Sequence, residues 1–343
     1  MRVLFAKDID RVEWSALVEA SATGTWFQTP EAYDFFASQP ELFAPFAVGI
    51  VSKPESDFGQ IDEERLRGVC VGYVTVEKGA LKQLLTRRAI VVGGPVLADD
   101  ATEDEVAALM SAVRKELKSK AIYVECRNFN DYSKWRSAFE IAGFEYVPHL
   151  NFHVDTSSVE VVESNLGKNR KRDIRTTIRE GVNIIEHPTE QQVIEYYSIL
   201  ENLYKTKVKT PLFPLSFFLS LRNHKDGRLL LTEYNGKIIG GTVCVELAGK
   251  CVYEWFVCGE DGVYPHVFPS SYATYAGICY AAEHDMPRFD MMGAGTPDEA
   301  YGVRDFKARF GGKEVEHGRF LCVTKPLLYK IGKFGVYLLK KRK

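Results

Sequence analysis

The chain has 343 residues, is 45% hydrophobic and 26% charged, and carries a formal net charge of −2. This length and composition predict about two globular domains, and the small charge excludes a global field for nucleic acid, so any anion site must be local. Seven scattered cysteines without a Cys-x-x-Cys pattern favour buried thiols over disulfides or zinc. Without a signal peptide or a run of about 18 apolar residues, we expect a cytoplasmic protein.

Strand-like runs alternate with helical spacings along the first half of the chain. Thr102 and Glu105 form a capping-box pattern ahead of apolar residues at helical spacing, which predicts a helix start. Residues 52–66 are polar and predict a surface loop. The expected elements are strands over 68–76 and 89–95, a helix over 102–118, a strand over 121–126, a helix over 132–142 and a strand over 146–154.

The second half repeats this order. Asn235-Gly236 predicts a tight hairpin turn between two strands. The expected elements are strands over 228–234, 237–247 and 250–258, a helix over 270–284, a strand over 288–292, a helix over 300–310 and a strand over 313–323. The repeat argues for a duplicated α/β unit. We expect domains over 1–155 and 156–324, followed by a basic helix over 325–343.

A cationic stripe precedes the second set of strands. Its members recur every three or four residues and therefore share one face of a helix, whose other face carries Leu166, Ile174 and Ile178. Such a stripe fits either phosphate binding or a solvated helix face. The stripe consists of Lys168, Arg172, Arg175 and Arg179.

The segment from Asp290 to Gly312 is the most unusual in the chain. A strand runs through a glycine-rich turn into a short helix, in which Lys307 lies between Phe306 and Phe310. This spacing places one lysine beside the packed face, near backbone that Gly293 leaves open to close approach. The arrangement suits an anionic group near a cleft; a helix end with solvated cations is the alternative.

Four segments of the sequence resemble motifs of the Fem family of peptidoglycan-bridge aminoacyltransferases. The resemblance covers roughly residues 25–325 and rests on four segments in the family's order: Trp26 to Glu31, Gly93 to Val96, Arg172 to Arg175 with Gly181-Val182, and Tyr301 to Gly312. It implies an α/β protein of two tandem domains that resemble GNAT acyltransferases, each a mixed sheet flanked by helices.

The resemblance also implies where substrates bind. The helix start at Ser270 and Ser271 offers free N–H groups to an anion, although an ordinary helix cap has the same sequence. Lys207 and Lys209 stand where a family arginine grips the acceptor's peptide, and Tyr253 is expected to line the acceptor groove. The glycine-rich pyrophosphate loop of acetyl-CoA-dependent GNAT enzymes is absent, which disfavours CoA without excluding it.

The implied activity is aminoacyl or acyl transfer to an amine, in peptidoglycan or envelope precursor synthesis. Lys307 is the catalytic candidate, because it would stabilise the oxyanion that develops during transfer. Arg304, Ser270 and Ser271 would hold donor phosphate, and Arg172 and Arg175 would add phosphate contacts. The donor would be aminoacyl-tRNA or an acyl-CoA, the acceptor a lipid-linked peptide or an amino sugar, and neither a metal nor a tightly bound cofactor is expected.

Two other functions stay open. One is a CoA-dependent N-acyltransferase that acts on a sugar amine or an amino acid. The other is a non-catalytic scaffold at the inner face of the membrane. The segment 325–343 bears on the second, because it combines cations with Leu327, Ile331 and Phe334 at helical spacing. Such a helix either packs on the domain or contacts anionic membrane.

Overall fold

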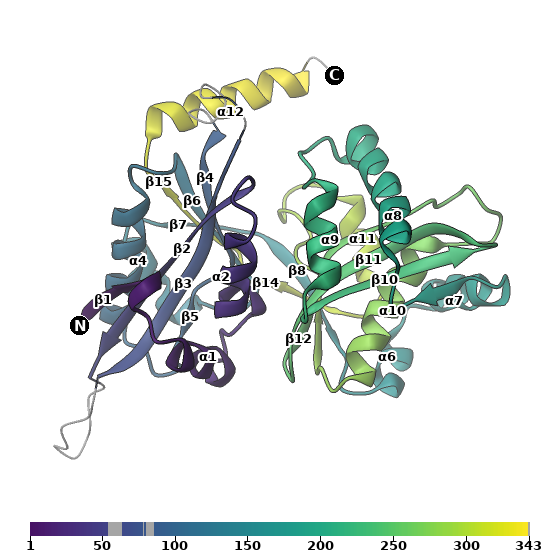
Figure 1. Ribbon diagram of the computed structural model, residues 1–343, viewed down its shortest axis with the longest axis horizontal. Coiled ribbons are helices and arrows are strands. Elements are labelled where there is room, and N and C mark those ends of the chain that lie inside the picture. The colour runs from purple at the N-terminus through teal and green to yellow at the C-terminus, as the bar shows by residue number, and fades with distance from the viewer. Residues whose placement is uncertain (54–63, 78, 80–85, 342–343) are drawn as a thin grey trace. The chain divides into compact units, whose positions relative to one another are not determined.

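The computed structural model describes residues 1–53, 64–77, 79 and 86–341, with side chains described up to residue 334. The chain divides into two compact units, residues 1–148 with 317–343, and residues 149–316 (Figure 1). Most of the polar loop expected over residues 52–66 lies outside the described residues.

The first unit is built on a mixed sheet. Only β4 and β6 run parallel among its described strands, and β5 pairs with β3 beside the main path. The strand order is β1 (Arg2–Phe5), β2 (Phe43–Ser52), β3 (Arg65–Thr75), β4 (Arg88–Gly93), β6 (Tyr123–Asn128), β15 (Arg319–Val323) and β7 (Glu145–Val147), with β5 at Val96–Leu97.

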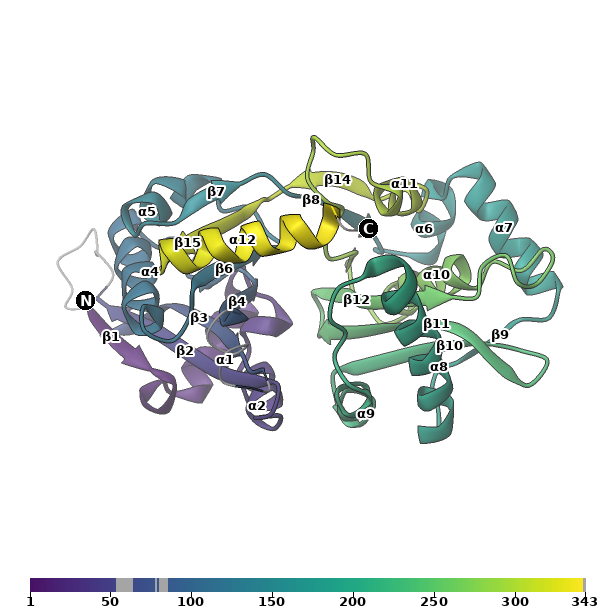
Figure 2. The same ribbon diagram turned by 90° about the horizontal axis from the view of Figure 1, so that it is seen from above.

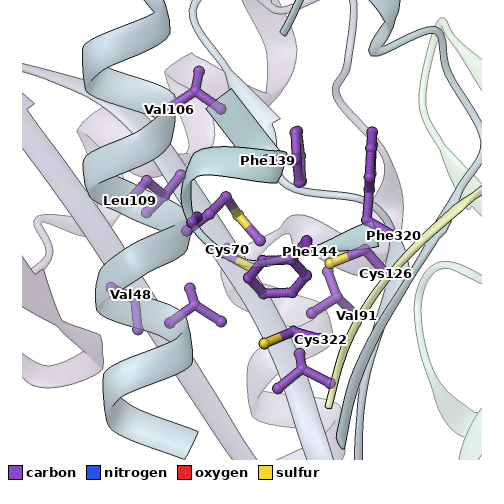
Figure 3. Close-up of a cluster of buried hydrophobic side chains, with 14 of the residues drawn as sticks. Val48, Cys70, Val91, Val106, Leu109, Cys126, Phe139, Phe144, Phe320 and Cys322 are labelled. Carbon is purple, nitrogen blue, oxygen red and sulfur yellow. The ribbon is translucent and has the colours of Figure 1, made fainter. Parts of the chain in front are cut away.

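Helix α4 covers one face of this sheet and shows how the first core forms. It begins at Thr102, whose side chain accepts from the Glu105 N–H while the Glu105 carboxylate accepts from the Thr102 N–H, so the predicted capping box is confirmed. Val106 and Leu109 then point at the apolar side chains of β2 and β3 (Figure 3). The described helices of the first unit are η1 (Ala6–Asp8), α1 (Arg11–Ala20), η2 (Trp26–Gln28), α2 (Pro30–Ala37), α4 (Glu103–Leu117), η3 (Ser133–Trp135), α5 (Arg136–Ile141) and α12 (Pro326–Lys341).

The second unit has a sheet of the same kind, in which β12 and β13 form the parallel pair. The predicted hairpin turn is confirmed, since Asn235 and Gly236 both adopt positive φ, at 51° and 75°. The strand order is β14 (Lys313–Glu316), β8 (Leu150–Asp155), β13 (Arg288–Asp290), β12 (Cys251–Gly259), β11 (Lys237–Leu247), β10 (Gly227–Tyr234) and β9 (Asn183–Ile185).

Helices pack on both faces of the second sheet. Trp255 of β12 contacts Phe217 of α9 with ring centroids 5.2 Å apart, while Glu254, the next residue back, bonds to Thr274 of α10. Strand alternation therefore directs neighbouring side chains of β12 to opposite helix layers. The helices are α6 (Val159–Asn165), α7 (Lys168–Arg179), α8 (Glu190–Leu203), the π-helical turn η4 (Tyr204–Val208), α9 (Leu215–Asn223), α10 (Pro269–Glu283) and α11 (Gly302–Ala308).

The strands at both borders of the units correct the predicted domain boundaries. The single strand expected over 146–154 is two strands: β7 joins the first sheet and β8 the second. The strand expected over 313–323 is likewise divided, so β14 pairs with β8 and β15 with β6 (Figure 2). Pro148 and Gly318, at φ 63°, interrupt the two runs. The first unit thus takes residues 317–343 from the end of the chain, instead of ending at residue 155.

Three further observations concern the described residues only. None of their helices is long and apolar enough to cross a membrane. No cluster of three or more His, Cys, Asp or Glu side chains among them has a metal-binding arrangement. All seven cysteines are thiols and six of them are buried, in agreement with the sequence prediction.

Candidate active site

The parallel strands β12 and β13 separate soon after they meet. Only Val252 with Phe289 and Tyr253 with Asp290 are paired. Beyond them β12 continues along β11, whereas the chain after β13 turns away through residues 291–295. Met292, at φ 54°, and Gly293, at φ 109°, give this turn its left-handed backbone. Within the described residues, the edge of β12 from Glu254 onward therefore has no strand neighbour on this side.

Lys307 of α11 places its ammonium at this split. The side chain is only 8% exposed, which confirms that this lysine lies beside the packed face. Its Nζ donates to the carbonyl of Met291 and, at 2.8 Å, to that of Gly293. Phe306 and Phe310 anchor the helix with ring centroids 5.3 Å apart. An ammonium has three N–H groups, so these two bonds leave one donor for another acceptor.

Two buried carboxylates act electrostatically on the ammonium. Glu254 accepts at Oε1 from Thr274, at 2.8 Å, and from Thr242, at 3.3 Å, whereas its Oε2 has no hydrogen-bond partner among the described residues. Asp290 is fully buried, and its Oδ2 likewise makes no hydrogen bond among the described residues. Its Oδ1 accepts from the Asn151 amide and from the Met292 N–H, both at 2.7 Å, and its Oδ2 lies 3.1 Å from His153 Nε2. The two acids thus differ in how well their charges are satisfied.

The electrostatics of these groups are linked. Burial lowers the pKa of Lys307, and the negative charges of Glu254 and Asp290 offset part of this effect. Burial raises the pKa of Glu254, and Lys307 offsets part of that. Burial also opposes ionisation of Asp290, but the interactions with His153, Arg288 and Asn151 together outweigh burial, and the pKa of Asp290 is lowered. Low dielectric therefore couples the proton on Lys307 to the charge on Glu254.

A second cation lies at the start of α10. Arg170 of α7 is buried, donates to Ser271 Oγ and, at 3.2 Å, to the Phe306 carbonyl, and its guanidinium lies 4.5 Å from the Phe306 ring centroid. Burial lowers the pKa of Arg170 to about 10. The Ser270 N–H donates to Asp261 at 3.3 Å. Arg170 thereby ties the expected anion site at Ser270 and Ser271 to the helix that carries Lys307.

Two of the predicted binding residues have other surroundings than expected. Arg304 donates to the carbonyls of Ala294, Thr296 and Pro297, so it braces the turn after β13 instead of presenting a free guanidinium to a donor phosphate. Tyr253 is fully buried in the sheet, so it does not line an open groove in this structure. Roles of Arg304 and Tyr253 in substrate binding stay predictions.

The cationic stripe lies on one exposed face of α7, as predicted. Arg172 is 2.9 Å from Asp173, and Arg175 is 3.9 Å from Glu163. Ile178 was expected on the apolar face, but 47% of it is exposed. The helix buries Arg170, Ile174 and Thr177 instead, because these residues share the face that meets the domain.

Lys207 and Lys209 are exposed around the π-helical turn η4. Lys207 acts electrostatically on Asp261, which places it near the start of α10. Lys209 adopts φ 57° and ends the turn. The structure therefore brings Lys207 into electrostatic contact with a group at the expected anion site.

Glu254, Asp290 and Arg170 were not among the predicted site residues. Glu254 carried a signal, because a charged residue in the apolar run Cys251–Gly259 must be buried with a partner or face a site. Arg170 gave no comparable signal, because it lies among the cations of the stripe in the sequence. Only the packing of α7 shows that Arg170 belongs to the buried face of that helix.

Comparisons with known proteins agree with this architecture. Residues 229–335, which contain Lys307 and the split strands, match the model of the FemAB family. The crystal structure of FemX superposes with a TM-score of 0.70 at 12% identity, covering 96% of this chain and 99% of that one. No curated protein matches the sequence.

Two further solved structures share the fold. One is the C-terminal domain of a putative lysylphosphatidylglycerol synthetase from Agrobacterium fabrum, with a TM-score of 0.53, 14% identity and 91% coverage of each chain. The other is a tandem GNAT protein from the clavulanic acid biosynthesis pathway, with a TM-score of 0.53, 10% identity and coverage of 94% and 99%. The predicted fold of two tandem GNAT-like domains is confirmed. Residues 229–335 are thus similar to the FemAB family, and the chain as a whole shares the fold of FemX.

Proposed function

We propose that this protein is an acyltransferase of the aminoacyltransferase type, which forms an amide on an amine acceptor in the synthesis of peptidoglycan or envelope precursors. The observation that carries the proposal is the buried Lys307 ammonium at the split between β12 and β13, inside the segment that matches the FemAB family. The match and the GNAT-like neighbours support a transferase.

Amide formation of this kind is assisted by a positive charge close to the carbonyl oxygen that becomes the oxyanion. The acceptor amine attacks the activated carbonyl, a C–N bond forms, and the carbonyl oxygen becomes an oxyanion. The C–O bond of an ester, or the C–S bond of a thioester, then breaks, and the leaving group takes up the proton that the amine releases. The third N–H of Lys307 would bind the oxyanion. The carbonyls of Met291 and Gly293 hold the ammonium in place beforehand, so little reorganisation is needed during reaction.

We favour aminoacyl-tRNA as the donor. The exposed stripe on α7 offers four cations to a phosphate backbone. At the start of α10, the Asp261 carboxylate already accepts from the Ser270 N–H, and a second anion there would meet charge repulsion. This disfavours a CoA diphosphate at the helix start. The second candidate, a CoA-dependent N-acyltransferase, is supported by the likeness to a tandem GNAT protein.

A lipid-linked acceptor would lie at a membrane surface, and α12 offers a way to reach it. Leu327, Ile331 and Phe334 are 79%, 58% and 63% exposed, and Lys330 and Lys333 lie among them. This combination of an apolar stripe with cations suits the interface of an anionic bilayer. Contact of α12 with such a bilayer is part of the proposal.

A transfer assay separates the candidate functions. The purified chain is given an amine acceptor, a peptidoglycan precursor or an amino sugar, together with either radiolabelled aminoacyl-tRNA or an acyl-CoA. Amide formation from the charged tRNA alone is the expected result. Formation from acyl-CoA alone would establish the second candidate, and absence of transfer from both donors, with vesicle binding retained, would favour a scaffold.

A further inference from the structure

We propose that Glu254 is a positioning residue that keeps Lys307 protonated at the split between β12 and β13. The inference rests on the proposed function of Lys307 and deepens it. Glu254 itself is not expected to touch the reacting atoms. It acts through the ammonium, which would hold the oxyanion only while it is charged.

The strand register brings the two residues together. Tyr253 and Asp290 are the last paired residues of the parallel strands, so Glu254 comes next on β12, where the chain of β13 continues into Met291. The carbonyl of Met291 is one of the two that receive the Lys307 ammonium. Glu254 points to the α10 layer, where Thr274 fixes Oε1 at 2.8 Å. The acid is thus held beside the split by the sheet on one side and by α10 on the other.

Glu254 is the acid that makes no ion pair among the described residues. Its Oε2 is fully buried and has no hydrogen-bond partner among the described residues. Asp290 is the other anion that acts on Lys307, and its Oδ2 likewise makes no hydrogen bond among the described residues. That oxygen lies 3.1 Å from His153 Nε2, however, and Oδ1 accepts from Asn151 and Met292. The neutral carbonyls of Met291 and Gly293 orient the ammonium without balancing its charge. Glu254 therefore supplies the countercharge that no other group has taken up.

The remaining charged groups around the site do not replace Glu254. His153 of β8 and Arg288 of β13 both act on Asp290. Arg170 of α7 bonds to the carbonyl of Phe306, the residue before Lys307, and a second cation there favours loss of the Lys307 proton rather than its retention. On α10, the neighbouring Thr274 and Ser271 carry no charge. A buried ammonium without an anion releases its proton, and a neutral amine has little to offer an oxyanion.

The direct test titrates Lys307 in the whole protein, without any substrate. Lysine labelled with ¹³C at Cε gives one NMR signal for each residue, and the Lys307 signal is identified by its loss in Lys307→Met. In the wild type we expect Lys307 to be protonated at neutral pH. In Glu254→Gln its titration midpoint should fall by about one to three pH units, because an opposite charge has been removed. Glu254→Asp, which retains the charge, should restore part of the shift. An unchanged midpoint in Glu254→Gln would overturn the inference.

Glu246→Gln is the matched control. Glu246 is another buried glutamate of the same sheet, but it pairs with Arg228 at 2.6 Å. Its loss should leave the Lys307 midpoint unchanged, so a general response of the sheet to losing a carboxylate is distinguished from a specific one. Equal shifts in both variants would also contradict the assigned role of Glu254.

A second measurement covers the case in which Glu254→Gln folds poorly. Lys307→Met combined with Glu254→Gln removes both buried charges, so its urea midpoint should lie above that of Glu254→Gln alone. If the loss of stability in the double variant equals the sum of the losses in the two single variants, the coupling between Glu254 and Lys307 is contradicted.

Activity then separates this inference from the proposed function. If transfer occurs, Glu254→Gln should lower kcat at neutral pH with little change in KM, and the basic limb of the pH–rate profile should move down by the same amount as the NMR midpoint. A shifted NMR midpoint in a protein without transfer activity would support the coupling and refute the proposed function. Full activity with a shifted midpoint would refute the role of Glu254 in catalysis.

Discussion

The two units contain the same parallel strand pair, and they treat it differently. In the first unit β4 and β6 remain paired over six residues, from Arg88 with Tyr123 to Gly93 with Asn128. In the second unit β12 and β13 are paired over two residues and then separate. Continuous pairing satisfies backbone groups along the whole first pair, whereas the second pair leaves polar backbone open to other partners.

The partners of these open carbonyls differ as well. After β4, the hydroxyl of Tyr132 shares its single hydrogen between the carbonyls of Gly93, at 3.2 Å, and Pro95, at 2.6 Å. After β13, the corresponding bonds come from the Lys307 ammonium. A neutral hydroxyl closes the first turn, while a buried cation closes the second.

The buried glutamates complete the contrast. Glu125 of β6 is held by Arg127, at 2.9 Å, and Arg319, at 2.7 Å. Burial opposes its ionisation, but the two arginines outweigh burial and lower its pKa to about 2. Glu254 has one unpartnered oxygen and a raised pKa. Matched charges fit a structural role in the first unit, and the unmatched charge in the second unit is what we expect at the proposed site, where stability is given up for chemistry.

The largest expected effect is on catalysis at Lys307. Lys307→Met should lower kcat about 100- to 1,000-fold with a smaller change in substrate affinity, because it removes charge that acts on the transition state. Lys307→Arg should restore little, since a planar fork does not reproduce a point charge. The exposed Lys313→Met is the control for a nearby lysine.

The counterpart of this change in the first unit is Tyr132→Phe. It should leave turnover intact and cost about 1–3 kcal/mol of stability in urea unfolding, because two buried carbonyls lose their donor. Full turnover in Lys307→Met, on an established substrate, would remove the functional distinction between the two strand pairs.

The two glutamates should give stability curves of opposite slope. Glu125 has its pKa lowered from 4.5 to about 2, so its contribution is present above pH 4.5 and is lost as the pH falls through about 2. Between these two pH values the contribution of Glu125 to the free energy of unfolding changes by about 3 kcal/mol. Glu125→Gln should abolish this pH-dependent contribution.

Glu254 behaves in the other direction. Its pKa is raised above 4.5, and Lys307→Met should raise it further. In Lys307→Met the contribution of Glu254 to stability should therefore be fully present below pH 4.5 and should be lost as the pH rises through the raised pKa. Urea unfolding between pH 2 and pH 9 measures both slopes, and parallel curves for Glu125→Gln and Lys307→Met would contradict the contrast.

A smaller effect is expected on donor binding. Replacing Arg172 and Arg175 with alanine should weaken binding of charged tRNA, and this weakening should become smaller as the salt concentration increases. The slope of the logarithm of the binding constant against the logarithm of the salt concentration should be reduced by about 0.7–0.9 for each lost phosphate contact. The exposed Lys115 of α4 and Lys118, which caps the end of that helix, provide a control pair in the first unit. An unchanged slope in the α7 variant would assign the stripe to a solvated helix face.

The smallest effect concerns membrane contact. Leu327→Ser with Ile331→Ser should reduce sedimentation with anionic vesicles several-fold, because each change removes apolar area that the bilayer would bury. The melting temperature should change little, since both side chains are exposed. Val12→Ser on α1 removes an equally exposed apolar side chain and serves as the control. A lower melting temperature without vesicle binding would make α12 a packing element of the first unit.

Local chemistry made several features predictable from the sequence. The capping box at Thr102 and Glu105 and the turn at Asn235-Gly236 depend on neighbours a few residues apart, so their residue types alone indicate them. The same holds for the exposed stripe on α7, which follows from helical periodicity. Lys307 beside its two aromatic anchors is also a matter of spacing on one short helix.

Tertiary structure decided the features that join distant segments. Alternation along residues 146–154 and 313–323 marks extended chain, but only sheet pairing determines that β15 meets β6 and that β8 meets β13. The same limit applies to the candidate site. Glu254 lies 53 positions before Lys307 in the sequence, and nothing local connects them. They interact because β12 and β13 separate at that point, and a low-dielectric interior makes two buried charges depend on each other.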